Sequence, residues 1–166
     1  MYMNSHFLWA TMLLLPLLGC QQPDNASQET EKAELPPYDS LLVGAWENVS
    51  LKVTVNTIDN TDSIFTLMVP AGEWENKLGI KPIRTEYAPN NTYRSEYRNL
   101  QDSVIRITRG IWNVFSDTLL LIEPEATYQY LMRYRNDIIE FRSQLDWDGD
   151  GQDDDEYLGL QRKLKK

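Results

Sequence analysis

The sequence predicts an all-β domain, and two observations carry that prediction. The first is alternation with a period of two. Over residues 127–135, Tyr and Met alternate with polar, charged or other residues, which is typical of a strand with one face on a core. The second is the regular spacing of turn signals such as Ser116-Asp117 and Asn136-Asp137. About eight or nine short antiparallel strands with such spacing predict a sandwich or a closed barrel.

The expected strands follow one another from residue 46 onward. They cover residues 46–56, 63–69, 83–87, 92–98, 104–108, 111–115, 118–122, 127–135, 138–143 and 157–163. Only residues 71–78 fit a helix. Trp74 and Leu78 lie four residues apart on one helical face, and Gly79 provides a stop signal.

The N-terminus carries the features of an export signal. Residues 7–18 form an apolar run that is shorter than the roughly 20 residues a membrane-spanning helix needs, but its length fits a secretory signal. The run ends in Leu17-Leu18-Gly19-Cys20, which resembles the lipobox of bacterial lipoproteins. The resemblance implies cleavage before Cys20 and acylation of its thiol with chains such as palmitate. An ordinary signal peptide or a buried apolar helix is the alternative.

These features divide the chain into three parts. Residues 1–19 are the expected signal peptide, residues 20–40 a lipidated, polar and flexible tether, and residues 41–166 one β-domain. Because two or more acyl chains make a stable anchor, we expect the mature protein to stay on a membrane of the cell envelope. Gln21 and Gln22 form no obvious retention signal, which favours the outer membrane and leaves the face open.

Composition excludes several function classes. The only cysteine is Cys20 and the only histidine, His6, lies in the expected signal. The mature domain therefore lacks a Ser-His-Asp or Cys-His mechanism and the usual zinc ligands. The net charge of −9 falls entirely after residue 19. An acidic domain repels phosphate backbones, so nucleic acid is not expected as a partner.

Two G-x-W triplets stand near the starts of expected strands, Gly44-Ala45-Trp46 and Gly110-Ile111-Trp112. With their flanks LLVGAWENVS and RGIWNVFSDTLLL, they give a layout that resembles the lipocalin-like domains of bacterial lipoproteins, from about residue 41 to residue 163. The resemblance implies an antiparallel up-and-down lipocalin-like β-barrel, with a β-sandwich as the alternative. It also implies that Trp46 closes one barrel end and that Arg162 covers its ring by a cation–π contact. Both tryptophans are expected in the core rather than against a ligand.

An acidic loop carries the clearest chemical pattern. Residues 146–156 hold seven acidic side chains and match the D-x-D-x-D-G pattern of calcium loops. The expected oxygen ligands are Asp146, Asp148, Asp150, the Gln152 carbonyl, Asp154 and Glu156, the last standing one residue early because Tyr157 occupies the usual glutamate position. We expect weak, structural Ca²⁺ binding, and a solvated turn is the alternative.

Three functions stay open from the sequence. The lipocalin resemblance implies a membrane-anchored, non-catalytic domain that binds a small apolar ligand, since eight-stranded barrels hold one small ligand or are filled by side chains. The alternative is an interaction or scaffold lipoprotein with a solid barrel that binds an envelope protein. An enzyme with two carboxylates, such as Glu86 and Glu96, is disfavoured because strand carboxylates usually face solvent.

The tyrosines leave the ligand contacts unassigned. Their spacing of two or four places several on one strand face, which fits either an aromatic ligand wall or ordinary sheet packing. The residues concerned are Tyr93, Tyr97, Tyr128, Tyr130 and Tyr134.

Overall fold

The computed structural model describes residues 36–56, 61 and 63–165. The expected signal peptide (1–19), the expected lipidation site Cys20 and the tether up to residue 35 lie outside these residues. Neither helix in the described part of the chain is long and apolar enough to cross a lipid bilayer.

Nine strands and two short helices follow one another in the described residues. They are α1 (Tyr38–Leu42), β1 (Gly44–Val55), β2 (Phe65–Val69), α2 (Trp74–Leu78), β3 (Arg84–Tyr87), β4 (Thr92–Arg98), β5 (Val104–Phe115), β6 (Thr118–Ile122), β7 (Thr127–Arg135), β8 (Ile138–Leu145) and β9 (Asp155–Lys163). The helix expected before Gly79 is confirmed as α2. Gly79 ends it in the left-handed region with φ of 66°, and its N–H donates to the Glu75 carbonyl.

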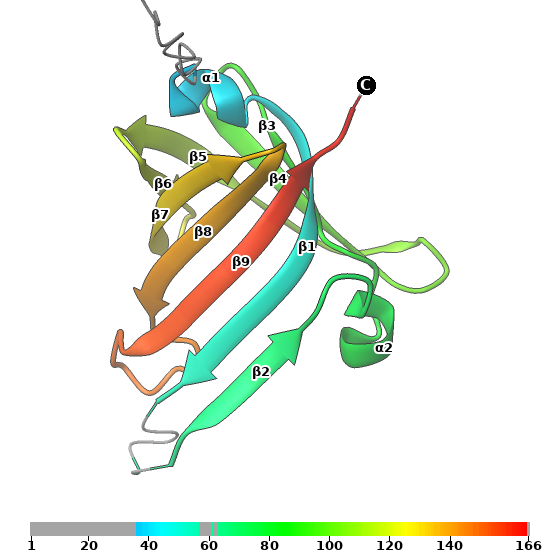
Figure 1. Cartoon of the computed structure of the whole chain (residues 1–166), viewed down its shortest axis with the longest axis vertical. Helices are drawn as coiled ribbons and strands as arrows, with labels where there is room; N and C mark the ends of the chain where they lie inside the picture. Colours follow the sequence, from blue (N-terminus) through cyan, green and yellow to red (C-terminus); the bar gives the residue numbers. More distant parts are fainter. Residues whose placement is uncertain (1–35, 57–60, 62, 166) are drawn as a thin grey trace, which may run out of the picture. The chain divides into compact units, whose positions relative to one another are not determined.

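Eight of the strands close into an antiparallel barrel (Figure 1). From β3 to β9 each strand pairs with the next along the chain, and β1 pairs with both β3 and β9. β2 is an additional strand that pairs with residues 51–55 of β1, beyond residues 44–47, which pair with β3. The predicted all-β antiparallel barrel is therefore confirmed, and a β-sandwich is not formed.

One long strand, β5, replaces the two short strands expected at 104–108 and 111–115. Gly110 lies inside it, directly opposite Tyr93 of β4. Residues 104–111 of β5 pair with β4, whereas residues 111–115 pair with β6, which ends at Ile122. Residues 104–110 of β5 therefore have no β6 residues paired with them on the side away from β4.

One end of the barrel is closed by a tryptophan. The Trp46 side chain is fully buried, and its Nε1 donates to the Leu42 carbonyl of α1 over 2.7 Å. Trp112 is 2 % exposed and belongs to the same apolar cluster. The core positions predicted for both G-x-W tryptophans are confirmed. α1 includes residues 38–40, which the sequence assigns to the tether, because Leu42 is buried and Tyr38 packs against this end.

The cation over Trp46 is Lys163, and the prediction of Arg162 is wrong. The Lys163 Nζ lies 5.3 Å from the centroid of the Trp46 ring and donates to the Leu41 carbonyl over 2.6 Å. Lys163 stands opposite Trp46 in the β1–β9 pair, so both point inward, whereas Arg162 stands opposite Glu47 and reaches it outside the barrel. Burial lowers the pKa of Lys163, and the nearby Asp137 opposes this shift.

Candidate functional site

The barrel interior holds a cavity of about 570 Å³. Its floor lies next to the Trp46 end of the barrel. There Asn48 of β1 pairs with Gln161 of β9, two residues along each strand from the Trp46–Lys163 pair. Its other end is lined by Trp74 of α2 and by residues of the loop between β8 and β9. Neither Trp46 nor Trp112 lines it, although both belong to the apolar cluster that supplies Tyr87 and Phe141 to the cavity wall.

The floor of the cavity is polar although it is buried. Asn48 is 8 % exposed, and the Gln161 Nε2 donates to its Oδ1 over 3.3 Å. Beside them, the buried hydroxyls of Thr85 and Ser95 form a hydrogen bond of 2.8 Å. The Gln161 Oε1 is buried and accepts no hydrogen bond from any described residue.

Aromatic rings form one part of the wall, and leucine and isoleucine side chains form another. Tyr130 lies at the centre of this wall, with its ring centroid 5.4 Å from that of Tyr157, 5.9 Å from that of Phe141 and 6.5 Å from that of Tyr128. Tyr93 and Tyr97 line the cavity from β4. Four of the five tyrosines singled out by the sequence therefore face the cavity. The fifth, Tyr134, packs at the closed end, where its backbone N–H donates to the Tyr38 hydroxyl.

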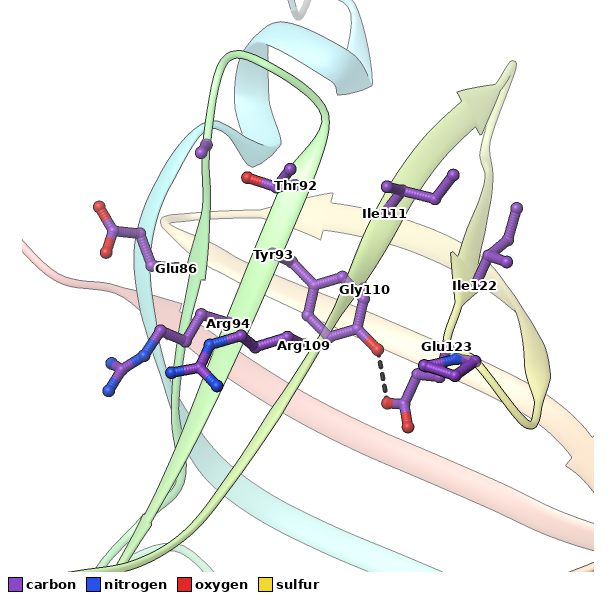
Figure 2. A pocket seen from close by; sticks show the side chains of 11 residues that line it. Glu86, Thr92, Tyr93, Arg94, Arg109, Gly110, Ile111, Ile122 and Glu123 are labelled. Atoms are coloured by element: carbon purple, nitrogen blue, oxygen red, sulfur yellow. Dashed lines mark hydrogen bonds between the residues drawn. The ribbon is translucent and has the colours of Figure 1, made fainter.

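Two glycines at inward positions make room for tyrosine rings. A Cβ at Gly159 would lie 2.5 Å from the Tyr157 hydroxyl, and a Cβ at Gly110 would lie 2.8 Å from a ring carbon of Tyr93. Figure 2 shows the Tyr93 ring beside Gly110 and its hydroxyl pointing to Glu123. The missing side chains let both rings lie against the sheet and preserve space in the barrel.

Most cavity hydroxyls form no hydrogen bond with another described residue. The Tyr93 hydroxyl donates to the Glu123 carboxylate over 2.5 Å. Burial, followed by this hydrogen bond and the Glu123 charge, raises the pKa of Tyr93. Five further tyrosines line the cavity without a hydroxyl hydrogen bond to any described residue: Tyr87, Tyr97, Tyr128, Tyr130 and Tyr157.

The cavity lining includes few charges. The Arg106 guanidinium lies 5.2 Å from the centroid of the Tyr97 ring and forms no ion pair with a described residue. Glu123 and Asp146 supply carboxylates. Glu123 and Tyr93 also line a groove on the outer face of β4, β5 and β6, where Arg94 and Arg109 stand opposite each other (Figure 2).

Alkaline pH is expected to unfold the domain because of the buried phenols. Burial, and then the charge of Tyr97, raises the pKa of Tyr157 to about 12, and burial raises the pKa of Tyr87 as well. Unfolded tyrosines ionise near about pH 10. Stability is therefore fully present below pH ~10 and is lost as the pH rises toward the folded pKa.

Urea unfolding at about pH 8 and about pH 11 checks this expectation. Tyr157→Phe should lose less stability between the two pH values than the unchanged chain, since one buried phenol is removed. Equal unfolding free energies at both pH values would contradict it.

The acidic loop brings three carboxylates together. One oxygen from each of Asp146, Asp148 and Asp155 lies within 4.8 Å of the others. Asp155 is not among the expected ligands; it is fully buried and accepts from the N–H groups of Asn56 and Trp147. The two Asp146 carboxylate oxygens accept from the N–H groups of Gly149 and Gly151.

The other expected ligands lie elsewhere in the loop or beyond it. The Asp150 Oδ1 accepts from the Gln152 N–H, and the Asp154 carbonyl accepts from the Asn56 side chain. Glu156 is exposed on β9, opposite Gln144 of β8. Two of the three residues in the carboxylate cluster, Asp146 and Asp148, are therefore among those expected from the sequence.

The two strand carboxylates considered for catalysis lie on the outer barrel face. Glu86 stands opposite Arg94 in the β3–β4 pair. Glu96 forms ion pairs with Arg94 and Arg98, and hydrogen bonds from these two arginines hold the pKa of its carboxyl below its usual value. Glu96 is thus engaged in a surface ion-pair network.

Sequence reasoning missed the polar members of the cavity. Alternation along each strand would have shown that these residues face the barrel interior, once the register against Trp46 or Tyr93 is known. They are Asn48, Arg106, Glu123 and Gln161. A scan against protein-family models finds no match to the chain, and searches of the curated proteins and of the solved structures find none either.

Proposed function

We propose that this chain is a lipid-anchored protein of the cell envelope whose barrel carries one small ligand. The observation that carries the proposal is the interior cavity of about 570 Å³ with aromatic walls. Ligand sites in proteins range from about 300 to 1,000 Å³ and combine aromatic lining with a few placed polar groups. The cavity meets both criteria.

The arrangement of glycines favours a carrier over a solid barrel. An eight-stranded barrel is just wide enough to be filled by its own side chains. Here Gly110 and Gly159 take inward positions where larger side chains would reduce the space. The Trp46 ring stabilises the closed end and does not itself line the cavity.

The anchor and the lack of catalysis in this proposal rest on the sequence. The Leu17–Cys20 lipobox supports lipidation at Cys20, and the outer membrane is the proposed location. The proposal includes no catalytic step, because residues 21–166 contain neither histidine nor cysteine.

Native mass spectrometry of the full chain tests the proposal. The chain, produced with its own signal and purified gently from the envelope, is expected to carry an additional small mass that leaves on denaturation. Thr108 faces the cavity, so Thr108→Phe should reduce the bound fraction. Thr127 is exposed on β7, so Thr127→Phe is the matched control. A lipidated polypeptide with no additional mass would contradict the carrier function.

One surface feature favours the alternative of a scaffold lipoprotein. Three large apolar side chains of β5 point outward: Ile105 is 57 %, Ile111 47 % and Phe115 64 % exposed. A row of this kind is a candidate contact for an envelope protein. Absence of a bound small mass, together with a partner that is lost on Phe115→Ser, would support this alternative.

We also propose that the acidic loop binds Ca²⁺ weakly, with a Kd of about 10⁻⁴ to 10⁻³ M. The cluster of Asp146, Asp148 and Asp155 supports this proposal. Because the Trp147 N–H donates to Asp155, ion binding is expected to change Trp147 fluorescence. Asp148→Asn should weaken the response, and Asp153→Asn, outside the cluster, should not. No change up to about 5 mM Ca²⁺ would refute the site.

A further inference from the structure

We infer that the preferred ligand of the cavity is a neutral, planar aromatic compound of the phenol class, whose hydroxyl enters first and reaches the floor. This inference rests on the proposed carrier function. It departs from the small, wholly apolar ligand that the lipocalin resemblance implies. Three properties of the cavity lead to it: the buried acceptor in the floor, the aromatic wall and the charges of the lining.

One buried acceptor in the floor, the Gln161 Oε1, receives no hydrogen bond from a described residue. The Gln161 amide uses its Nε2 to bind the Asn48 Oδ1, and this leaves the Oε1 buried with no donor among the described residues. Buried acceptors in native proteins are nearly always satisfied. A ligand hydroxyl at the inner end supplies the missing donor, whereas a methyl group in the same place leaves the acceptor unsatisfied. The difference should weaken binding of the methyl compound about tenfold.

The wall selects a flat ligand. Tyr130 contacts Tyr157 and Phe141 edge-on, and Trp147 lies 6.3 Å from Tyr157 at the outer end. Gly159 allows the Tyr157 ring to lie along its own strand. Flat ring systems pack offset or edge-to-face on such surfaces. The Tyr130 hydroxyl, which forms no hydrogen bond with another described residue, also offers a partner to a ring substituent, and an acyl chain does not use this partner.

The charges of the lining disfavour an anionic head group. Among the cavity residues the carboxylates of Glu123 and Asp146 outnumber the one guanidinium, that of Arg106. The Arg106 cation is already placed against the Tyr97 ring. The whole chain carries a net charge of −9, which repels anions further. A neutral phenol avoids this repulsion, and a fatty carboxylate does not.

Calorimetric titration of the full chain with a matched pair of probes tests the inference. The pair is 2-naphthol and 2-methylnaphthalene, which have the same ring system and nearly the same size but differ in the hydroxyl. Palmitate is the acyl probe. We expect 2-naphthol to bind about tenfold more tightly than 2-methylnaphthalene, and palmitate to bind more weakly than 2-naphthol.

The double variant Asn48→Leu/Gln161→Leu should abolish the preference for 2-naphthol, because it removes both amide acceptors of the floor. Gln161→Leu alone would leave the Asn48 Oδ1 without its donor and so create a new acceptor. Gln129 is exposed on the outer face of β7, so Gln129→Leu should keep the preference. If the double variant does not fold, the two probes on the unchanged chain decide the matter alone. Equal or tighter binding of 2-methylnaphthalene or palmitate would overturn the inference.

The same measurements separate this inference from the carrier function. A chain that holds a natural ligand by native mass spectrometry but binds neither naphthalene probe remains a carrier, and the phenol inference fails. A chain with no bound mass and no probe binding fails on both counts.

Discussion

Trp46→Ala is expected to lower the free energy of unfolding by about 3–5 kcal/mol, the range for removal of a buried tryptophan. The ring is fully buried and packs beneath Lys163, and its Nε1 donates to the Leu42 carbonyl. Truncation leaves a cavity, an unsatisfied carbonyl and a half-buried cation without its aromatic partner. Because domains of this size are stable by only about 5–15 kcal/mol, much of the stability should be lost.

Urea unfolding followed by far-ultraviolet circular dichroism measures the loss, with Trp147→Ala as the matched control. Trp147 is 44 % exposed and lies in the loop between β8 and β9, so its truncation should cost less than about 1 kcal/mol. Equal losses in the two variants would show that Trp46 does not close the barrel as an essential plug.

Gly110→Ala is the second substitution with a large expected effect, about 3 kcal/mol or more. A Cβ at this position would lie 2.3 Å from the carbonyl oxygen of Ile122 and 2.8 Å from a ring carbon of Tyr93. The ring can rotate, but the carbonyl belongs to the β6 backbone and can move only if the β5–β6 pairing shifts. The substitution should therefore weaken the barrel at the place where β6 ends.

Gly72→Ala is the control for Gly110→Ala. Gly72 has φ of 82° and no atom within 4 Å of an added Cβ, so alanine there meets only the backbone cost of about 1–2 kcal/mol. Unfolding in urea compares the two. If Gly110→Ala is as stable as the unchanged chain, the close approach of β5 and β6 is not as tight as described.

The effect of Gly110→Ala should also reach the cavity. Tyr93 lies over Gly110 and donates to Glu123, so a displaced ring breaks a contact between the cavity wall and the outer groove. The folded fraction of the Gly110→Ala variant should bind 2-naphthol more weakly than the unchanged chain does. Trp46→Ala, by contrast, removes a ring that does not itself line the cavity.

Local signals in the sequence determined most of the secondary structure. Period-two alternation placed β7 at residues 127–135, and the left-handed backbone of Ser116, Asn136 and Asp137 matches the turn signals read there. Backbone geometry alone sets the period of two and the conformations that turn residues adopt. The barrel prediction came from the spacing of these signals together with the G-x-W resemblance.

Closure of the barrel decided what the sequence left open. β1 shows why: between Asn48 and Ser50 its register against β9 shifts, so the inward positions change from Trp46 and Asn48 to Leu51 and Val53. Simple alternation along the strand does not predict such a bulge.

The same non-local pairing selected Lys163 instead of Arg162 as the cover of Trp46, and it placed Asp155 beside Asp146. A one-residue step exchanges the two faces of a strand, so only the pairing of distant strands fixes which side chains meet. The sequence by itself determined the strands, the turns and the tryptophan plug. The tertiary structure decided the cavity, its polar floor and the members of the carboxylate cluster, because these depend on register between strands far apart in the chain.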